Sequence, residues 1–369
     1  MRESSALGVE ARGDAGREIP AAFRPARPFP LRAPLLTLWL VLLLVASVTL
    51  GAAIGVVQLP FWDTLWIIVA RSLRLPVELD PGQAAIIWSV RLPRVLVAGL
   101  VGFALAASGA AMQGLFRNPL ADPGIIGVSA GGSMGAVVAI FLQLHTVSGW
   151  WTPAFAFAGA LLAASLAYAL ATRGGRTDTA TLLLAGVALS SLFSAVISLL
   201  YHFVEDGILR QIVYWLMGNL AGRRWEHLSL AAPFVLAGTA GLMLLATELN
   251  IMAGGEDDAR SLGVPVERVK RAVLVCVSLA TGAAISVTGM IGFVGLIVPH
   301  MLRLVIGPDH RWLIPTSGLL GASFLILCDL IARTVFSPIE LRTGIVTAIF
   351  GVPFFLYLLM RRREMVAWR

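Results

Sequence analysis

The sequence predicts an all-α membrane protein that crosses the bilayer about ten times, and three observations support this prediction. Hydrophobic residues make up 58% of the 369 residues, and charged residues only 13%. The apolar residues gather in stretches of about 20, the length that a helix needs to cross about 30 Å of hydrocarbon. Short polar segments with glycine and proline separate the stretches. So apolar a composition is typical of a chain whose main solvent is lipid.

About ten stretches qualify as spans. We expect them near residues 35–59, 95–116, 125–144, 151–172, 180–203, 228–247, 272–290, 291–306, 312–335 and 345–360. A short turn at Gly289 or Gly292 would separate the seventh span from the eighth. Residues 35–362 would form one transmembrane domain, preceded by a polar and disordered tail over residues 1–34.

Arginine placement predicts how the spans are oriented, because short loops rich in arginine and lysine stay in the cytoplasm. Both ends of the chain are basic, so both are expected in the cytoplasm, which requires an even number of spans. Residues 60–90 and 205–227 are mixed in charge and would face outward. The net charge of +7 reflects this bias and not nucleic-acid binding, since the arginines are distributed among many loops.

The sequence restricts the energy source of any transport. A P-loop is absent, and the only lysine, Lys270, lies in a basic run, so the chain cannot be its own P-loop ATPase. Asp329 and His300 are the candidates for an ion path inside the expected spans, and Asp329 has Arg333 as a partner four residues on. Neither makes a convincing ion path. Either an ion gradient drives a secondary transporter, or a separate subunit supplies the energy.

Residues 113–124 form a polar, proline-rich segment between the second and third expected spans. It contains Gln113, Asn118, Pro119, Asp122 and Pro123. Irregular backbone at membrane depth is stable only where protein or a water-filled cavity satisfies it, which favours a hinge on a transport pathway. A tight turn outside the membrane explains the same residues, since Asn-Pro and Asp-Pro-Gly are common turn formers.

Residues 250–271 predict two short amphipathic helices, the first ended by Gly263 and the second begun by Pro265. Such a pair would dock in a groove of a partner. A solvated charged loop is the simpler alternative. A magnesium site at residues 256–258, as in membrane prenyltransferases, is disfavoured because no second acidic cluster would hold the other side of a diphosphate.

Small residues and cysteines bear on packing and on cofactors. Gly127, Gly131 and Gly135 form a seam that lets a neighbouring helix approach closely. Cys276 and Cys328 both lie inside expected spans, so neither a disulfide nor a metal site with paired ligands is expected.

Five segments in the same order resemble the FecCD-type permease family. They are residues 91–94, 112–124, 182–189, 259–263 and 292–300. The resemblance covers nearly all of the chain after the tail, and residues 114–123 are most similar to the haem branch. Members of this family are the membrane subunits of bacterial ABC importers for iron siderophores, haem and cobalamin.

The resemblance implies a type II ABC importer permease that works as a homodimer in the bacterial inner membrane. Haem is the expected substrate, delivered by a periplasmic binding protein and passed along the dimer axis. Two copies of a separate ATPase would bind ATP, so this chain would be no enzyme and would hold no permanent cofactor. A ferric siderophore or cobalamin is the alternative substrate. A gradient-driven secondary transporter and a membrane-embedded enzyme are the alternative classes.

The resemblance also assigns roles to individual residues. Docking of the binding protein falls on Arg91, Arg94 and Arg333. Arg342 is added because the family usually has proline in its place. Coupling to the ATPase falls on Asp258, Arg260, Ser261, Leu262, Gly263 and Val264. The cytoplasmic gate falls on Thr177, Asp178 and Thr179, and the fifth span and residues 208–217 would line the pathway.

Overall fold

The computed structural model describes residues 32–55, 59–75 and 81–367, and it confirms the predicted helical membrane fold. Seven of the described helices are long and apolar enough to cross a membrane, and three shorter apolar helices accompany them. These helices correspond one to one to the predicted stretches. Residues 1–31 of the predicted polar tail lie outside the described residues.

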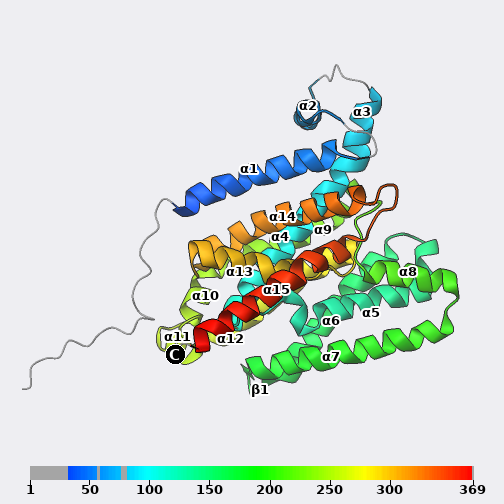
Figure 1. The fold of residues 1–369 in the computed structure, drawn as a ribbon. Coiled ribbons are helices and arrows are strands. Elements are labelled where there is room, and N and C mark those ends of the chain that lie inside the picture. The colour runs from blue at the N-terminus through cyan, green and yellow to red at the C-terminus, as the bar shows by residue number, and fades with distance from the viewer. Residues whose placement is uncertain (1–31, 56–58, 76–80, 368–369) are drawn as a thin grey trace, which may run out of the picture.

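The first half of the chain leads from α1 to a small hairpin and α7 (Figure 1). Its helices are α1 (Arg32–Ala53), α2 (Phe61–Ser72), α3 (Pro81–Ala85), α4 (Leu92–Leu115), α5 (Val128–Phe141), α6 (Trp151–Ala171) and α7 (Thr179–Leu200). A π-helical turn covers Ile86–Arg91, and 3-10 turns cover Pro123–Ile126, Leu144–Thr146 and Tyr201–Phe203. The strands β1 (Thr172–Arg173) and β2 (Arg176–Thr177) pair antiparallel, with Thr172 opposite Thr177.

In the second half, helices are the only regular secondary structure among the described residues. Its helices are α8 (Asp206–Leu216), α9 (Trp225–Leu244), α10 (Ala246–Met252), α11 (Glu256–Ser261), α12 (Val266–Thr288), α13 (Val294–Ile306), α14 (His310–Thr334) and α15 (Thr343–Ala367).

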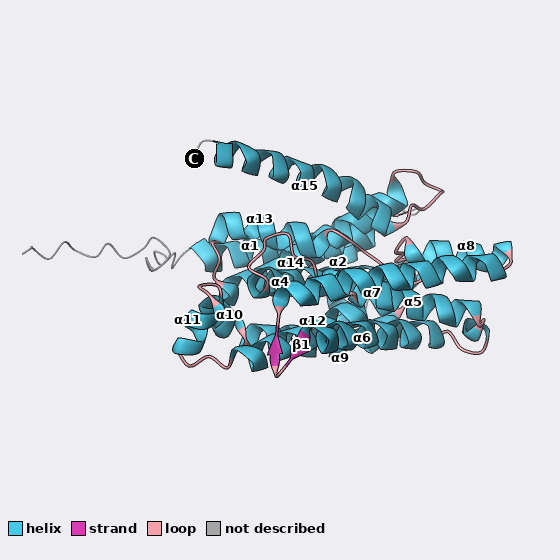
Figure 2. Cartoon of the chain, turned by 90° about the horizontal axis from the view of Figure 1, so that it is seen from below, coloured by secondary structure: helices cyan, strands magenta, loops and turns pink. Residues whose placement is uncertain are grey.

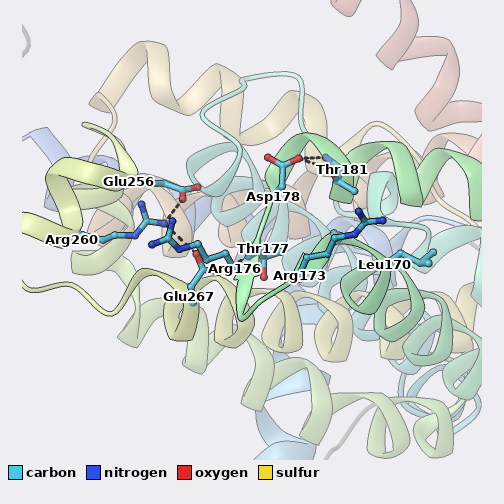
Figure 3. A pocket seen from close by; sticks show the side chains of 10 residues that line it. Leu170, Arg173, Arg176, Thr177, Asp178, Thr181, Glu256, Arg260 and Glu267 are labelled. Atoms are coloured by element: carbon cyan, nitrogen blue, oxygen red, sulfur yellow. Dashed lines mark hydrogen bonds and ion pairs between the residues drawn. The ribbon is translucent and has the colours of Figure 1, made fainter.

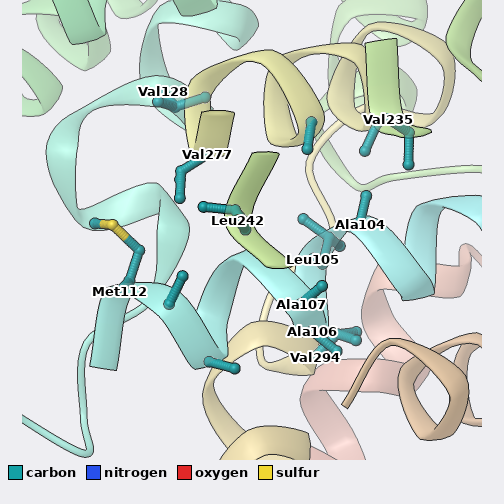
Figure 4. Close-up of a cluster of buried hydrophobic side chains, with 14 of the residues drawn as sticks. Ala104, Leu105, Ala106, Ala107, Met112, Val128, Val235, Leu242, Val277 and Val294 are labelled. Atoms are coloured by element: carbon teal, nitrogen blue, oxygen red, sulfur yellow. The ribbon is translucent and has the colours of Figure 1, made fainter. Parts of the chain in front are cut away.

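The helix α4 lies at the centre of the bundle, in contact with α9, α12, α13 and α14. In the helix that contains it, 78% of the most apolar stretch is buried. Figure 4 shows its short side chains, among them Ala104, Ala106 and Ala107, facing the larger residues of its neighbours. Such small residues let helix backbones approach closely where lipid supplies no hydrophobic driving force.

The bundle has two distinct ends. The chain enters α1 and leaves α15 at the end that carries α10 and α11, whereas α8 lies at the opposite end (Figures 1 and 2). We name them the α11 end and the α8 end. An even number of crossings follows, as the sequence predicted.

One predicted boundary was wrong, because Arg91 and Arg94 lie inside a helix and not before the second span. The helix runs from Gly82 to Leu115 without a break. Its π-helical turn at Ile86–Arg91 directly precedes the segment that contains Pro93. Proline has no N–H to donate and crowds the preceding turn, so a widened turn at this point keeps the helix continuous.

The charged segment 250–271 also differs from its prediction. Gly263, with a φ of +85°, follows α11 as expected. The second predicted helix is not separate, since it forms the first turns of α12, which continues from Val266 to Thr288. No glycine or proline lies between Val266 and the start of the apolar part. The charged first turns of α12 and its apolar, membrane-length part therefore form one continuous helix.

The predicted glycine seam is confirmed at Gly131 and Gly135. A Cβ atom at Gly135 would overlap the carbonyl oxygen of Phe155, and one at Gly131 would overlap the carbonyl oxygen of Gly159. Gly127 has another role, because its φ of +86° forms the left-handed turn that begins α5. The backbones of α5 and α6 are therefore in direct contact.

We expect Gly135→Ala to destabilise the protein by about 1–3 kcal/mol, because the added methyl group pushes α5 away from α6. Gly149→Ala is the control, since nothing lies within 4 Å of a Cβ atom there. Thermal unfolding of the detergent-solubilised protein is the measurement, and only Gly135→Ala should lower the midpoint. Equal midpoints would show that the α5–α6 contact tolerates a methyl group.

Candidate coupling, gate and docking sites

Charged side chains brace α11 and join it to α12. Arg260 Nη1 lies 2.7 Å from Asp257 Oδ1, and its Nη2 lies 3.0 Å from Glu256 Oε2, both within α11. The same Nη2 lies 3.3 Å from Glu267 Oε1 on α12 (Figure 3). These contacts show that Arg260 braces the short helix, while its predicted coupling to an ATPase stays a prediction.

The six predicted coupling residues form one continuous turn at the α11 end. Asp258, Arg260 and Ser261 belong to α11, and Ser261 Oγ donates to its own helix at the Asp257 carbonyl (3.0 Å). Leu262 follows with 71% of its surface exposed, whereas Val264 is 9% exposed and anchors the turn. An apolar side chain is thus presented to the outside at the tip of a braced helix.

The predicted gate residues lie where the hairpin meets α7. Thr177 ends β2, Asp178 is the N-cap and Thr179 is the first residue of α7. Asp178 Oδ2 accepts hydrogen bonds from the backbone N–H (2.7 Å) and hydroxyl (2.6 Å) of Thr181. These bonds hold the pKa of the Asp178 carboxyl below its usual range, so its charge caps α7 at neutral pH.

A cavity of about 510 Å³ lies between the hairpin and α11 (Figure 3). Its polar lining comes from Arg173, Arg176, Thr177, Asp178, Glu256 and Arg260 among others. Residues predicted for the gate and residues predicted for coupling therefore share one cavity wall, although about 80 positions separate them in the sequence.

The predicted hinge is partly helical. Gln113 lies in the last turns of α4, is 2% exposed, and its Nε2 donates to the Leu296 carbonyl of α13 (3.0 Å). Pro123 begins the 3-10 turn before α5 and lies against Gly295. The segment therefore returns into the bundle and packs on the start of α13.

The other polar residues of the predicted hinge accept hydrogen bonds from backbone N–H groups of their own loop. Asn118 Oδ1 accepts from the Leu120 N–H (3.0 Å), with Pro119 as the middle residue of that turn, and Asp122 Oδ1 accepts from the Gly124 N–H (2.8 Å). Side chains that bond to backbone two residues on are typical of tight turns. For Asn118 and Asp122 the structure favours the turn interpretation over the transport-pathway interpretation.

A buried ion-pair cluster lies at the α8 end. Arg94 Nε lies 2.9 Å from Asp329 Oδ2 and Arg94 Nη2 lies 3.0 Å from Asp329 Oδ1, a bidentate pair between α4 and α14. The Asp329 side chain is 2% exposed. It also accepts from Thr343 Oγ1 (3.1 Å), while Arg94 Nη1 reaches Glu340 (3.0 Å).

The predicted Asp329–Arg333 pair exists, but it is the weaker contact. Arg333 Nε lies 3.7 Å from Asp329 Oδ2, because the rest of its guanidinium donates to the carbonyls of Gly51 and Ile54 at the end of α1. The predicted pairing with Arg333 is therefore confirmed, and the closer partner of Asp329 is Arg94. Sequence spacing cannot reveal an arginine 235 positions away.

Arg91 and Arg333 together cap the end of α1. Arg91 is 8% exposed and its Nη1 donates to the carbonyls of Ala52 (3.0 Å) and Ala53 (2.8 Å). The last carbonyls of a helix lack intrahelical donors and carry partial negative charge, so cations stabilise them. Three of the four arginines predicted for docking thus hold α1, α4 and α14 together. Their docking role stays a prediction.

Two further arginines lie at the α8 end. Arg342, the fourth predicted docking residue, has its Cζ 4.1 Å from the Tyr214 ring centroid, a cation–π contact that joins the start of α15 to α8. Sequence reasoning missed Arg223. Burial and the nearby Arg94 charge lower its pKa to about 10, so it remains charged at neutral pH. The basic pair at 223–224 in an outward loop was the available signal.

The fifth span, α7, is the most exposed of the long apolar helices. Only 17% of its most apolar stretch is buried, against 78% for the helix that contains α4. Leu184, Val187 and Leu192 are 71%, 56% and 57% exposed, whereas Leu182 is 1% exposed. The helix therefore presents one broad apolar face away from its own bundle.

Candidate metal ligands are scattered. Within residues 32–55, 59–75 and 81–367, no three His, Cys, Asp or Glu side chains could together hold a metal ion. Cys276 lies on α12 and Cys328 on α14, and both are free thiols.

The described part of the bundle has seven membrane-length helices, a braced charged helix at one end and a buried arginine cluster at the other, as expected of a multi-pass membrane protein. Residues 42–361 match the FecCD transport family, and the chain belongs to this family. It is thus the permease subunit of an ABC importer, with ATP hydrolysis on a separate subunit. The family works with ATPase and substrate-binding partners.

Three relatives illustrate the similarity. The chain is 50% identical over 326 residues to the cobalamin import system permease of Halobacterium salinarum, covering 87% of this chain and 86% of the relative. It is 39% identical over 335 residues to the hemin transport system permease of Yersinia pestis, covering 90% of this chain and 97% of the relative. A solved structure of an inward-facing metal-chelate type ABC transporter superposes with a TM-score of 0.79 at 33% identity. The match covers 89% of this chain and 99% of that structure's chain.

Proposed function

We propose that this permease imports a metal chelate and that cobalamin is its first candidate substrate. The observation that carries the proposal is the 50% identity to a cobalamin permease over most of both chains. The preference for haem expected from residues 114–123 becomes the second candidate, supported by 39% identity to a hemin permease. A ferric siderophore is the third.

The two ends of the bundle suggest where the partners act. The α11 end carries the exposed Leu262 and would receive the ATPase, which would put this end, with the start of α1 and the end of α15, in the cytoplasm. The α8 end would receive the periplasmic binding protein in a bacterial inner membrane. Arg342 is the readiest of the four predicted arginines to meet an acidic partner, because the guanidinium groups of the other three are engaged by carboxylate or carbonyl oxygens of the bundle. The permease itself would hold no permanent cofactor.

A homodimer would use the apolar face of α7. A single copy leaves this helix largely uncovered, and two copies related by a two-fold axis would bring their α7 helices beside one pathway. Walls of leucine, valine and small residues would let a bulky chelate pass without binding it tightly. The hairpin and Thr177–Thr179, at the cytoplasmic end of α7, would close that pathway.

Cysteine cross-linking tests the α7 arrangement. In a chain whose Cys276 and Cys328 are replaced by alanine, Leu184→Cys or Val187→Cys should give a disulfide-linked dimer on mild oxidation. Leu182→Cys is the matched control, because its side chain is 1% exposed and faces the chain's own bundle. If neither exposed position yields a dimer, α7 does not lie at the two-fold axis.

Substrate trapping tests the function. Liposomes containing the permease, its ATPase and its binding protein are offered cobalamin, haem and a ferric siderophore separately, with and without internal ATP. We expect ATP-dependent accumulation of cobalamin. Accumulation of haem or a siderophore alone would keep the importer and change the substrate, whereas uptake that ignores ATP would contradict an ATP-driven importer and favour a gradient-driven carrier.

A further inference from the structure

The only lysine of the chain, Lys270, is buried against the hairpin of β1 and β2, which we call the gate hairpin. Of 28 basic residues, 27 are arginine, and Lys270 is the exception. Lys270 lies on the second turn of α12 and is 2% exposed. A buried ammonium is stable only where partners replace the water it has lost, so its contacts identify what it holds.

The ammonium contacts three oxygen atoms from three different segments. Lys270 Nζ lies 2.7 Å from Glu256 Oε2 on α11, 2.8 Å from the Thr177 carbonyl oxygen on β2 and 3.5 Å from Glu267 Oε1 on its own helix. An ammonium has three N–H donors on a compact centre, whereas the wider planar guanidinium suits bidentate pairs. This site therefore suits lysine better than the arginine used elsewhere in the chain.

The backbone of Thr177 is held on both sides. Its carbonyl accepts from Lys270, and its N–H donates to Glu267 Oε2 (2.9 Å). Both partners belong to the first turns of α12. The next residue is Asp178, the N-cap of α7. A displacement of this hydrogen-bonded unit therefore moves the start of α7.

The same carboxylates reach the coupling helix. Glu256 belongs to α11 and accepts from both Lys270 and Arg260, and Glu267 is also in contact with Arg260. The side chain of Arg260 is 37% exposed, and the exposed Leu262 follows it by two residues. A chain of charge-assisted contacts thus runs from the proposed ATPase contact to the gate hairpin.

We propose that Lys270 is a positioning residue that clamps the gate hairpin to α11, so that a movement of α11 is transmitted to the start of α7. This inference rests on the proposed function, because it takes α11 as the ATPase contact and α7 as the pathway helix. The clamp itself is a fixed distance between the gate hairpin and α11 that depends on Lys270, and it does not depend on which substrate is transported.

Two measurements on the full complex in liposomes test the clamp. Spin labels at Arg173→Cys on the hairpin and Asp257→Cys on α11, in a chain without Cys276 and Cys328, report the distance between the segments with and without ATP and vanadate. We expect a narrow distribution in both states that broadens in Lys270→Met, which keeps the apolar stem and removes the ammonium. Substrate moved per ATP hydrolysed should fall about tenfold, a size typical of a lost coupling between sites.

Three further variants complete the test. Lys270→Arg should recover only part of the ratio, because a guanidinium restores the cation but not the compact three-donor centre. Adding Glu256→Gln to Lys270→Met should cause little further loss, since both remove the same contact. If Lys270→Met fails to assemble, Glu256→Gln alone is measured in the same way. A narrow distribution and a wild-type ratio in either assembled variant would overturn the clamp. Failure of the unmodified complex to transport, with the distance effect intact, would instead contradict the proposed function and leave the clamp standing.

Discussion

Asp329→Ala should destabilise the permease by about 3–5 kcal/mol, the cost expected when one partner of a buried ion pair is removed and the other remains. Arg94 would lose both bonds of its bidentate pair and stay buried, with its side chain 12% exposed. Arg333 would lose its carboxylate neighbour, and Thr343 its acceptor. Thermal unfolding in detergent and the fraction recovered as a monodisperse peak measure the effect.

Asp257→Ala is the matched control for this prediction. Asp257 also pairs with an arginine, Arg260, at 2.7 Å, but its side chain is 98% exposed. Water and salt screen such a surface pair, so its loss should leave the unfolding midpoint unchanged. Equal effects of the two substitutions would show that the Arg94–Asp329 pair is hydrated in the protein and does not tie α4 to α14.

The helical fold could be predicted from the sequence because its causes are local. The length of an apolar run sets whether it spans the bilayer, and the glycine spacing at 131 and 135 marks a close helix contact. The start of the second span could not be predicted, since hydropathy does not show that the helix continues through Arg91. The prediction treated Pro265 as the start of a separate short helix and so missed that α12 is continuous. No residue between Pro265 and the apolar part of α12 ends a helix.

The gate and coupling roles stay predictions, and the contacts that join their residues could not be predicted from the sequence. The residues of the gate and of the coupling turn were named from contiguous motifs. The pairing of Lys270 with the Thr177 carbonyl joins positions 93 apart, and backbone acceptors leave no signal in side-chain identity. The same limit hid the helix-capping role of Arg91, whose partners are carbonyl oxygens of α1. A single lysine in an arginine-rich chain was the signal that was present and unused.

Leu262→Glu should weaken binding of the ATPase at least about tenfold, which corresponds to about 1.4 kcal/mol of binding free energy. Leu262 is 71% exposed at the tip of a helix whose other side chains are braced by ion pairs. A rigid helix that presents one large apolar side chain is typical of a helix that docks in a partner's groove, where a few buried anchors dominate affinity. A carboxylate in such a groove would lose its water without gaining a partner. Affinity of the purified ATPase for the permease in nanodiscs is the measurement.

Val147→Glu provides the control, because Val147 is 77% exposed and lies in the turn between α5 and α6 at the α8 end. The substitution adds the same charge to an equally exposed apolar position, far from α11, and should leave ATPase affinity unchanged. Both variants should keep the wild-type unfolding midpoint, since neither side chain belongs to the core. Wild-type affinity in Leu262→Glu would remove the α11 turn from the ATPase contact, and reduced affinity in both variants would attribute the effect to added charge and not to the position of Leu262.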